Sequence, residues 1–365
     1  MTKMKIYVIF FLRGDVMNIK LIGKPKIIMS NRGSKHNYFG WPTVAKLQDG
    51  KIMVGASGFR LEHVCPFGKG VISYSYDNGE TYTAPAPVID TPLDDRDVGI
   101  CPFGEKGVIV TSFNNSANMQ RDYNKENEYV QRYLDTITEE DEEKYLGATF
   151  RVSYDCGVTF GKIFHSPVTS PHGPRELRDG TILWVGNNFD NCEAGLEVVK
   201  LNPETAEAEF ISKITIDDKN IFINEPNILE LPDGRLICHT RAENDNLFTT
   251  YQCFSSDKGK TWTPLERILG ETDGAPPHLF LHSSGVLIST YGRRKEPYGI
   301  MAMFSTDYGK TWEKDIRIYE SKIDEDDLGY PSTIELDDGT LLTTFYAPAD
   351  EDRHCEIFQQ KWKLM

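Results

Sequence analysis

One eight-residue pattern occurs four times in the chain and constrains its fold more than any other feature. The pattern is Ser-x-Asp-x-Gly-x-Thr-aromatic, called the Asp box below, and its aspartates are Asp77, Asp155, Asp257 and Asp307. It is typical of a hairpin turn, in which the aspartate accepts backbone N–H groups, the glycine takes a positive φ and the aromatic ring packs beneath. The spacing of the copies indicates a unit of about 50 residues with some copies degenerate, which is the range of β-propeller blades.

A second turn signal fills the gaps between the Asp boxes. Leu-x-Asp-Gly sequences stand between apolar alternating runs, and two similar turns carry one extra residue. The six turn glycines are Gly50, Gly107, Gly180, Gly234, Gly285 and Gly339. Six such turns predict an all-β fold, a six-bladed β-propeller with four-stranded antiparallel blades. The Asp-Gly turn joins strands one and two of each blade, and the Asp box joins strands three and four. We expect the last strand, near 356–363, to pair with N-terminal residues and close the ring, because closure removes sheet edges.

The length of 365 residues then fits one ring over 17–365. Residues 1–16 precede a conventional-looking start at Met17 and form an N-terminal extension that can lie outside the fold. The segment 114–147 interrupts the blade rhythm, and its apolar spacing predicts an insertion with a short helix. A solvated excursion, a lid and a dimer contact are the alternative roles for this insertion.

Composition excludes several classes of protein. The 55 acidic and 40 basic residues give a formal net charge of −15, which argues against binding to nucleic acid or to an anionic membrane. No apolar run reaches the roughly 20 residues that span a bilayer. A cytoplasmic location is expected, with secretion as the alternative if 1–16 act as a signal. The seven cysteines form no CxxC pair, so we expect no disulfide framework, no metal and no cofactor. The oligomeric state stays open.

The turns also locate a candidate site. In every blade the start of strand one and the end of strand two meet at the end opposite the Asp-Gly turn. Counting back nine or ten residues from the turn glycines reaches four residues of chemical interest at equivalent central positions. They are Trp41, Asp97, Glu225 and Tyr330, in blades one, two, four and six.

Arginines stand at the same end of the blades. Counting forward from the turns reaches Arg60, Arg241, Arg293 and Arg294. A guanidinium binds a carboxylate through two parallel hydrogen bonds. An acidic chain can therefore still present a positive pocket to a small anionic sugar.

Asp boxes in a six-bladed organisation resemble the sialidase (neuraminidase) superfamily of BNR-repeat propellers, and the resemblance covers residues 20–365. In that family a glutamate activates a tyrosine nucleophile, and arginines hold the sugar carboxylate. Glu225 before Pro226, followed by Arg241, looks like the glutamate and arginine segment, and Tyr330 before Pro331 looks like the tyrosine segment. The resemblance implies an exo-acting, retaining glycoside hydrolase that removes a terminal sialic acid or related acidic sugar from a glycan.

The general acid/base has several candidates. Asp97 is the first choice, with Asp95 in reserve. The family places this group in the first-blade loop, where this chain has Glu62 and His63, so both compete with Asp97. Tyr330 also has a structural explanation, as a packed strand aromatic.

The chain departs from the family pattern in its first blade. The family opens this blade with Arg-Ile-Pro, and the matching stretch here, Phe39-Gly40-Trp41-Pro42, lacks that arginine. We interpret Trp41 as a pocket wall or a core residue, and Arg60 or Arg96 are the candidates to replace the arginine. His172 is a further candidate for substrate binding. His63, His172 and His278 could hold a metal only if blades one, three and five bring them together. These departures resemble a divergent branch.

The missing arginine motivates two alternative functions. One is a different glycosidase, or a lyase on uronate polysaccharides with His63 or Tyr330 as the base. The other is a glycan-binding propeller without catalysis. Every alternative has a glycan as the expected partner, and the preferred one has an anionic terminal sugar.

Overall fold

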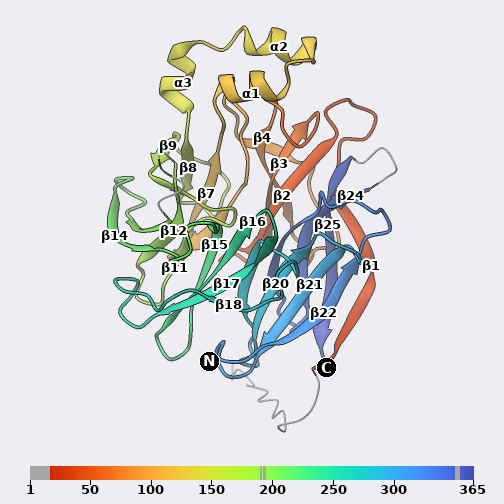
Figure 1. Cartoon of the computed structure of the whole chain (residues 1–365). Helices are drawn as coiled ribbons and strands as arrows, with labels where there is room; N and C mark the ends of the chain where they lie inside the picture. Colours follow the sequence, from red (N-terminus) through yellow and green to blue (C-terminus); the bar gives the residue numbers. More distant parts are fainter. Residues whose placement is uncertain (1–16, 190, 192–194, 350–353) are drawn as a thin grey trace.

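Six antiparallel sheets surround a central axis in the computed structural model, which describes residues 17–189, 191, 195–349 and 354–365 (Figure 1). Each sheet is one blade, and the chain completes the blades in sequence order. The prediction of a six-bladed β-propeller with four-stranded antiparallel blades is confirmed. The predicted N-terminal extension 1–16 lies outside the described residues.

The first three blades follow the predicted order of turns, with the Asp-Gly turn between strands one and two. In blade three the first strand is interrupted, and both of its short pieces pair with the second strand. Blade one contains β2 (Tyr38–Lys46), β3 (Ile52–Arg60), β4 (Lys69–Ser75) and β5 (Ala86–Ile89). Blade two contains β6 (Ile100–Phe103), β7 (Gly107–Phe113), β8 (Ala148–Ser153) and β9 (Phe164–Ser166). Blade three contains β10 (Val168–Thr169), β11 (Arg175–Glu176), β12 (Ile182–Asn188), β13 (Leu196–Leu201) and β14 (Ala208–Ile214).

The last three blades repeat this order, and blade six takes its outer strand from the N-terminal part of the chain. Blade four contains β15 (Phe222–Glu230), β16 (Leu236–Asn244), β17 (Leu247–Ser255) and β18 (Glu266–Arg267). Blade five contains β19 (Pro277–Leu281), β20 (Leu287–Arg293), β21 (Gly299–Ser305) and β22 (Glu313–Glu320). Blade six contains β23 (Gly329–Glu335), β24 (Leu341–Pro348), β25 (Cys355–Leu364) and β1 (Ile19–Met29).

Closure of the ring occurs within blade six. Strand β1 pairs antiparallel with β25, from Ile19 opposite Leu364 to Met29 opposite Ile357. The strand expected near 356–363 is therefore the one that meets the N-terminal residues. Because β1 covers the outer edge of β25, the last blade has the same four strands as the others.

The hydrophobic core lies between neighbouring blades. Each of six clusters of buried side chains combines residues from two adjacent sheets, which accounts for all six blade interfaces. Between blades five and six, for example, Phe304 packs near Phe345 and Trp362. Burying one large apolar side chain stabilises the fold by about 1.5–3 kcal/mol, so the stacking of blades holds the ring together.

The four Asp boxes form one hydrogen-bonded turn. In the first box Asp77 accepts from the Ser75 hydroxyl at 2.8 Å and from the Thr81 backbone N–H at 2.8 Å, and the Gly79 N–H donates to Ser75 Oγ at 2.8 Å. The hydrogen bonds from Thr81 lower the pKa of Asp77 to about 2. As expected the glycine has a positive φ, and so does the preceding residue, Asn78, at 57°.

The insertion forms three short helices, where the sequence indicated one. They are α1 (Ala117–Tyr123), α2 (Glu128–Leu134) and α3 (Glu139–Tyr145), between β7 and β8. Val130 and Leu134 are buried, and Leu61 and Phe67 of the first-blade loop pack against them. The helices therefore cover that loop at one end of the molecule (Figure 1).

No helix within the described ranges is long and apolar enough to cross a membrane. Six cysteines are free buried thiols, and Cys192 lies outside the described residues. The thiols are Cys65, Cys101, Cys156, Cys238, Cys253 and Cys355.

Candidate active site

Four side chains at the ends of first strands share a rare backbone conformation. Trp41, Asp97, Glu225 and Tyr330 have φ angles of 54°, 47°, 50° and 48°. This left-handed conformation costs a bulky residue about 1–3 kcal/mol. In β2, β15 and β23 the strand pairing slips by one residue at this position, which makes a β-bulge. A bulge changes the direction of a side chain, so equivalent backbone features position four different side chains in four blades.

Tyr330 and Glu225 are in direct contact across the ring. The Tyr330 hydroxyl donates a short hydrogen bond to Glu225 Oε1, and Arg241 Nη1 donates to Glu225 Oε2 at 3.0 Å. Arg241 also pairs with Glu243, so its guanidinium lies between two carboxylates. Burial raises the pKa of Tyr330 well above its ordinary value, and the charge of Glu225 adds to this effect. The phenol is therefore neutral, and Glu225 is positioned to accept its proton.

Asp97 belongs to the same cluster. The carboxyl is buried, with the residue 7% exposed, and it forms no hydrogen bond with another residue of the described chain. Burial raises the pKa of Asp97 to about 7; the charge of Glu225 also raises it, while Arg96 and Arg60 oppose the shift. A carboxyl group with this pKa is half protonated near neutral pH and can donate a proton to a leaving oxygen.

Two arginines flank the ring of Phe248 beside this cluster. The guanidinium carbons of Arg241 and Arg294 lie 4.7 Å and 5.4 Å from the Phe248 centroid, and that of Arg294 lies 5.7 Å from the Tyr330 centroid. Arg294 also donates to the Tyr346 hydroxyl at 3.1 Å. Arg241 and Arg294 therefore form the cationic side of the cluster, as the sequence predicts.

Arg293 points elsewhere. Its nearest carboxylate is Asp315 at 3.8 Å, at a strand position in β22, and it donates a long hydrogen bond to the Glu296 carbonyl at 3.5 Å. The structure does not bring Arg293 to Tyr330, although the sequence grouped it with Arg294. Successive residues at a strand end project to opposite sides, which explains why only one of the two faces the cluster.

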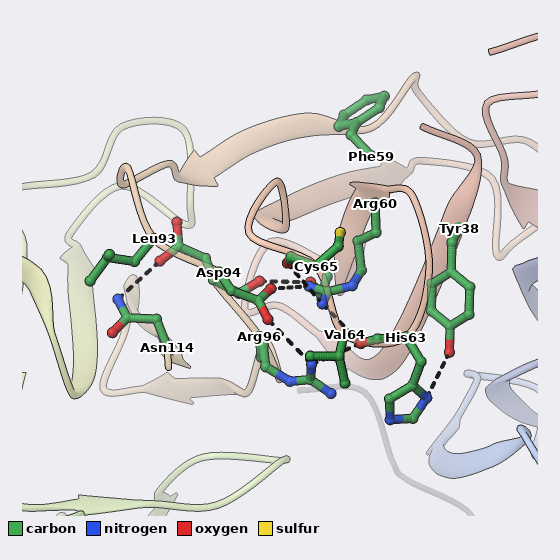
Figure 2. Close-up of polar contacts among 12 residues, drawn as sticks. Tyr38, Phe59, Arg60, His63, Val64, Cys65, Leu93, Asp94, Arg96 and Asn114 are labelled. Carbon is green, nitrogen blue, oxygen red and sulfur yellow. Dashed lines mark hydrogen bonds and ion pairs between the residues drawn. The ribbon is translucent and has the colours of Figure 1, made fainter. Parts of the chain in front are cut away.

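Arg60 and Arg96 converge on one buried carboxylate, Asp94 (Figure 2). Their guanidinium carbons lie 4.9 Å and 4.0 Å from the centroid of the Trp41 ring. Arg60 is 0% exposed and also donates to the backbone carbonyl of His63 at 3.0 Å. Trp41 is itself only 1% exposed, so Arg60 packs against a buried ring, and Arg96 at 7% is the more exposed of the two arginines. The Trp41 ring with these two arginines is called the Trp41 wall below.

Asp327 connects the first and last blades through hydrogen bonds, and the sequence analysis did not identify it as a site residue. It accepts hydrogen bonds from the Tyr38 hydroxyl at 2.7 Å and the Tyr346 hydroxyl at 2.9 Å, and His63 Nδ1 lies 2.9 Å from its Oδ1. Although burial acts to raise it, the pKa of Asp327 is lowered to about 2 by these hydrogen bonds and the charge of His63. In the sequence Asp327 is the last residue of an acidic run, 324–327, which by itself indicates only a charged loop.

A spacing signal could have found Asp327. It stands three residues before Tyr330, as Asp94 stands three residues before Asp97. In both blades the earlier aspartate supports the wall of the site, and the later residue stands at the bulge position.

Three other candidates lie away from the Tyr330 cluster. Asp95 accepts from the backbone N–H and hydroxyl of Thr91 at 2.7 Å and 2.9 Å, which is a structural role. Glu62 is exposed beside the insertion. His172 is buried against His278, with ring centroids 4.8 Å apart.

The three histidines weighed as metal ligands do not come together, because His63 contacts Asp327, whereas His172 and His278 contact each other. Across the ranges that the structure describes, no group of three or more His, Cys, Asp or Glu side chains has the geometry to hold a metal ion.

Comparison with known proteins agrees with this fold. A model of the BNR repeat-like domain matches residues 204–343. A protein of unknown function from Dyadobacter fermentans is 18% identical with a TM-score of 0.75, over 95% of this chain and 100% of its own. No curated protein matches the chain.

Two solved sialidases share the fold. A mutant of the NanB sialidase from Streptococcus pneumoniae is 12% identical with a TM-score of 0.65, over 93% of this chain and 70% of its own. The Trypanosoma rangeli sialidase in complex with sialic acid is 15% identical with a TM-score of 0.60, over 94% of this chain and 58% of its own. The chain thus shares the six-bladed propeller fold of these sialidases, and part of it matches the BNR repeat-like domain.

Proposed function

We propose that this protein is an exo-acting, retaining glycoside hydrolase that removes a terminal acidic sugar, sialic acid or a relative, from a glycan. The contact that carries the proposal is the hydrogen bond from the Tyr330 hydroxyl to Glu225, which is itself held by Arg241. A neutral phenol approaches an anomeric carbon beside an anionic substituent without the repulsion that a carboxylate nucleophile meets.

The first step forms a bond from Tyr330 Oη to the anomeric carbon. Glu225 takes the phenolic proton, the glycosidic bond breaks, and Asp97 protonates the departing oxygen. In the second step Asp97, now ionised, takes a proton from water, whose oxygen attacks the anomeric carbon. Tyr330 leaves and recovers its proton from Glu225, so the net reaction is hydrolysis with retention.

Arg241 and Arg294 bind the carboxylate of the sugar in this proposal. They lie on the same side of the cluster, at 4.7 Å and 5.4 Å from the Phe248 ring. Arg96 lies against the Trp41 ring, with its guanidinium carbon 4.0 Å from the ring centroid. Two arginines beside an aromatic ring favour a small acidic sugar. They place less positive charge around its carboxylate than the three arginines of the sialidase family pattern do.

Turnover of an aryl sialoside and an aryl glucuronide tests the proposal. Tyr330→Phe and Glu225→Gln should each lower kcat about 10³-fold, because each removes a group that acts in the bond-forming step. Tyr291→Phe is the matched control: Tyr291 is buried, and its hydroxyl has no partner in the described structure. Unchanged turnover in Tyr330→Phe, with the fold intact, excludes tyrosine catalysis.

A uronate lyase is the second candidate function, because the first blade lacks the arginine of the family pattern and the His63–Asp327 pair offers another base. A lyase gives an unsaturated product that absorbs ultraviolet light. Glycan binding without any product, measured by mass spectrometry, instead identifies a non-catalytic glycan-binding protein.

A further inference from the structure

A cavity of about 350 Å³ lies along the axis of the ring, apart from the Tyr330 cluster. All six blades line it, and its wall begins two residues beyond Trp41 and Glu225 and continues to the residues before the Asp-Gly turns. Among the lining side chains are those of Lys46, Cys101, Arg175, Asn227, His278 and Thr333. Its volume is at the lower end of the range for small-molecule sites.

Arg175 carries a positive charge into this cavity without an acidic partner. Within the part of the chain that the structure describes, no carboxylate lies within ion-pair distance of its guanidinium, and its one hydrogen bond is a long one, to the Leu279 carbonyl at 3.4 Å. Burial lowers the pKa of Arg175. By contrast the buried Arg60 and Arg241 each have a carboxylate partner. A half-buried guanidinium with N–H groups available for further hydrogen bonds is suited to an incoming anion.

The carboxylates on the cavity wall are already engaged. Glu176 accepts from the Gly104 backbone N–H at 2.9 Å, and Glu335 accepts from the Ser283 backbone N–H at 2.8 Å. These hydrogen bonds hold both groups toward neighbouring turns.

His172 supplies a second unsatisfied group. It is 4% exposed and lines the cavity, and its Nε2 has no hydrogen-bond partner among the described residues. Burial, with a smaller effect of the Arg175 charge, lowers its pKa to about 3, so the ring is neutral. The Thr43 hydroxyl can donate to the Pro171 carbonyl at 3.3 Å while it accepts from His172 Nδ1 at 3.0 Å. That arrangement satisfies Thr43 and leaves Nε2 as an acceptor.

We infer that this axial cavity binds a small hydroxycarboxylate. Its carboxylate pairs with the Arg175 guanidinium, and its hydroxyl donates to His172 Nε2. Neither residue belongs to the Tyr330 cluster, so the inference does not depend on the proposed hydrolase activity. Both residues come from one segment of blade three: His172 lies in the break between β10 and β11, and Arg175 is the first residue of β11.

Isothermal titration of the full chain with lactate, glycerate and gluconate tests the inference. We expect saturable binding of at least one of them, about tenfold weaker binding of the matched acid that lacks the hydroxyl, and no binding of the matched amide. Arg175→Gln should weaken binding at least tenfold, and Arg175→Lys should weaken it less. Arg178→Gln is the control, because Arg178 lies outside the cavity and pairs with Glu230.

Binding that survives in folded Arg175→Gln, or equal binding of chloride, overturns the inference, as does the failure of all three acids. If Arg175→Gln does not fold, a crystal structure of the unchanged protein with the bound acid decides. The carboxylate must lie within hydrogen-bond distance of Arg175, and density only at other places overturns the inference.

Discussion

The two ends of the blades use repetition in opposite ways. At the turn end, four Asp boxes repeat the same side chains and the same hydrogen bonds, as in Asp77 and Asp307. At the other end, four positions repeat the same left-handed backbone, but the side chains are a tryptophan, an aspartate, a glutamate and a tyrosine. Repetition of a residue together with its conformation marks the scaffold. The residue before each Asp-box glycine is also left-handed under changing side chains, at Asn78, Cys156, Lys258 and Tyr308. The two ends therefore differ in side-chain contacts: within the described blades, only at the other end do the left-handed residues hydrogen-bond to one another across blades, as Tyr330 and Glu225 do.

Among the variants that test this comparison, we expect Asp97→Asn, at the end opposite the Asp boxes, to have the largest effect on turnover. If Asp97 is the proton donor of the proposed mechanism, its loss should lower kcat about 10³-fold on a substrate with a poor leaving group. In the unchanged enzyme kcat/KM should fall as pH rises above about 7, because Asp97, whose pKa burial raises to about 7, loses its proton. The pH–rate profile checks both statements.

Asp95→Asn is the matched control for this measurement. Burial raises its pKa to about 7 as well, but its carboxylate binds Thr91 and lies away from the Tyr330 cluster. The alkaline fall in kcat/KM should persist in Asp95→Asn, and its disappearance there would assign the proton donor to Asp95 instead.

Asp94→Ala should destabilise the catalytic end of the fold by about 3–5 kcal/mol, because it leaves Arg60 and Arg96 buried without their carboxylate. Urea unfolding measures this change. Asp90→Ala removes a partly exposed pair with Lys69 and should cost less than about 1 kcal/mol. Equal costs for the two variants would mean that the Trp41 wall does not depend on its two arginines.

His63→Gln should lower kcat/KM by less than about tenfold. It loses the hydrogen bond to Asp327 and a contact with Trp41, with ring centroids 4.9 Å apart, but it leaves Asp97 in place. Steady-state kinetics at several pH values provide the test. A fall as large as that of Asp97→Asn would make His63 the acid/base.

Asp307→Ala should leave turnover within about twofold of the unchanged enzyme. It removes one set of turn hydrogen bonds from Thr311, which should cost about 1 kcal/mol after allowance for solvent screening. Thermal unfolding and the aryl glycoside assay check the two parts. Asp324→Ala, in an exposed loop, is the control. A large loss of turnover in Asp307→Ala would mean that the Asp-box end also affects activity, contrary to the comparison.

The blades could be predicted from the sequence because each turn is local. An Asp box contains every hydrogen-bond partner that its turn needs, so Asp77 and its three counterparts identify the blade edges without tertiary information. The equivalent positions of Glu225 and Tyr330 follow from counting along strands of fixed geometry. The same count reaches Trp41, Asp97, Glu225 and Tyr330, which turn out to share a left-handed backbone.

Contacts between blades could not be predicted in this way. Arg293 and Arg294 look the same in sequence, yet only Arg294 reaches Tyr346. Asp327 looked like part of a charged loop, and its role depends on Tyr38 at the other end of the chain. The lack of an acidic partner at Arg175 depends on what the other blades place around the axis.

The pairing of β1 with β25 also determines when, during synthesis, the Tyr330 cluster can assemble. Tyr330 stands on the first strand of the one blade that needs both β1 and β25. During synthesis β1 is the first of these strands to emerge. It stays unpaired until its partner β25 has left the ribosome. Glu225 and Asp97 belong to blades that are already translated by then. Tyr330 therefore joins Glu225 and Asp97 last, and a nascent chain that stops before β25 contains all three residues without being able to assemble them into one cluster.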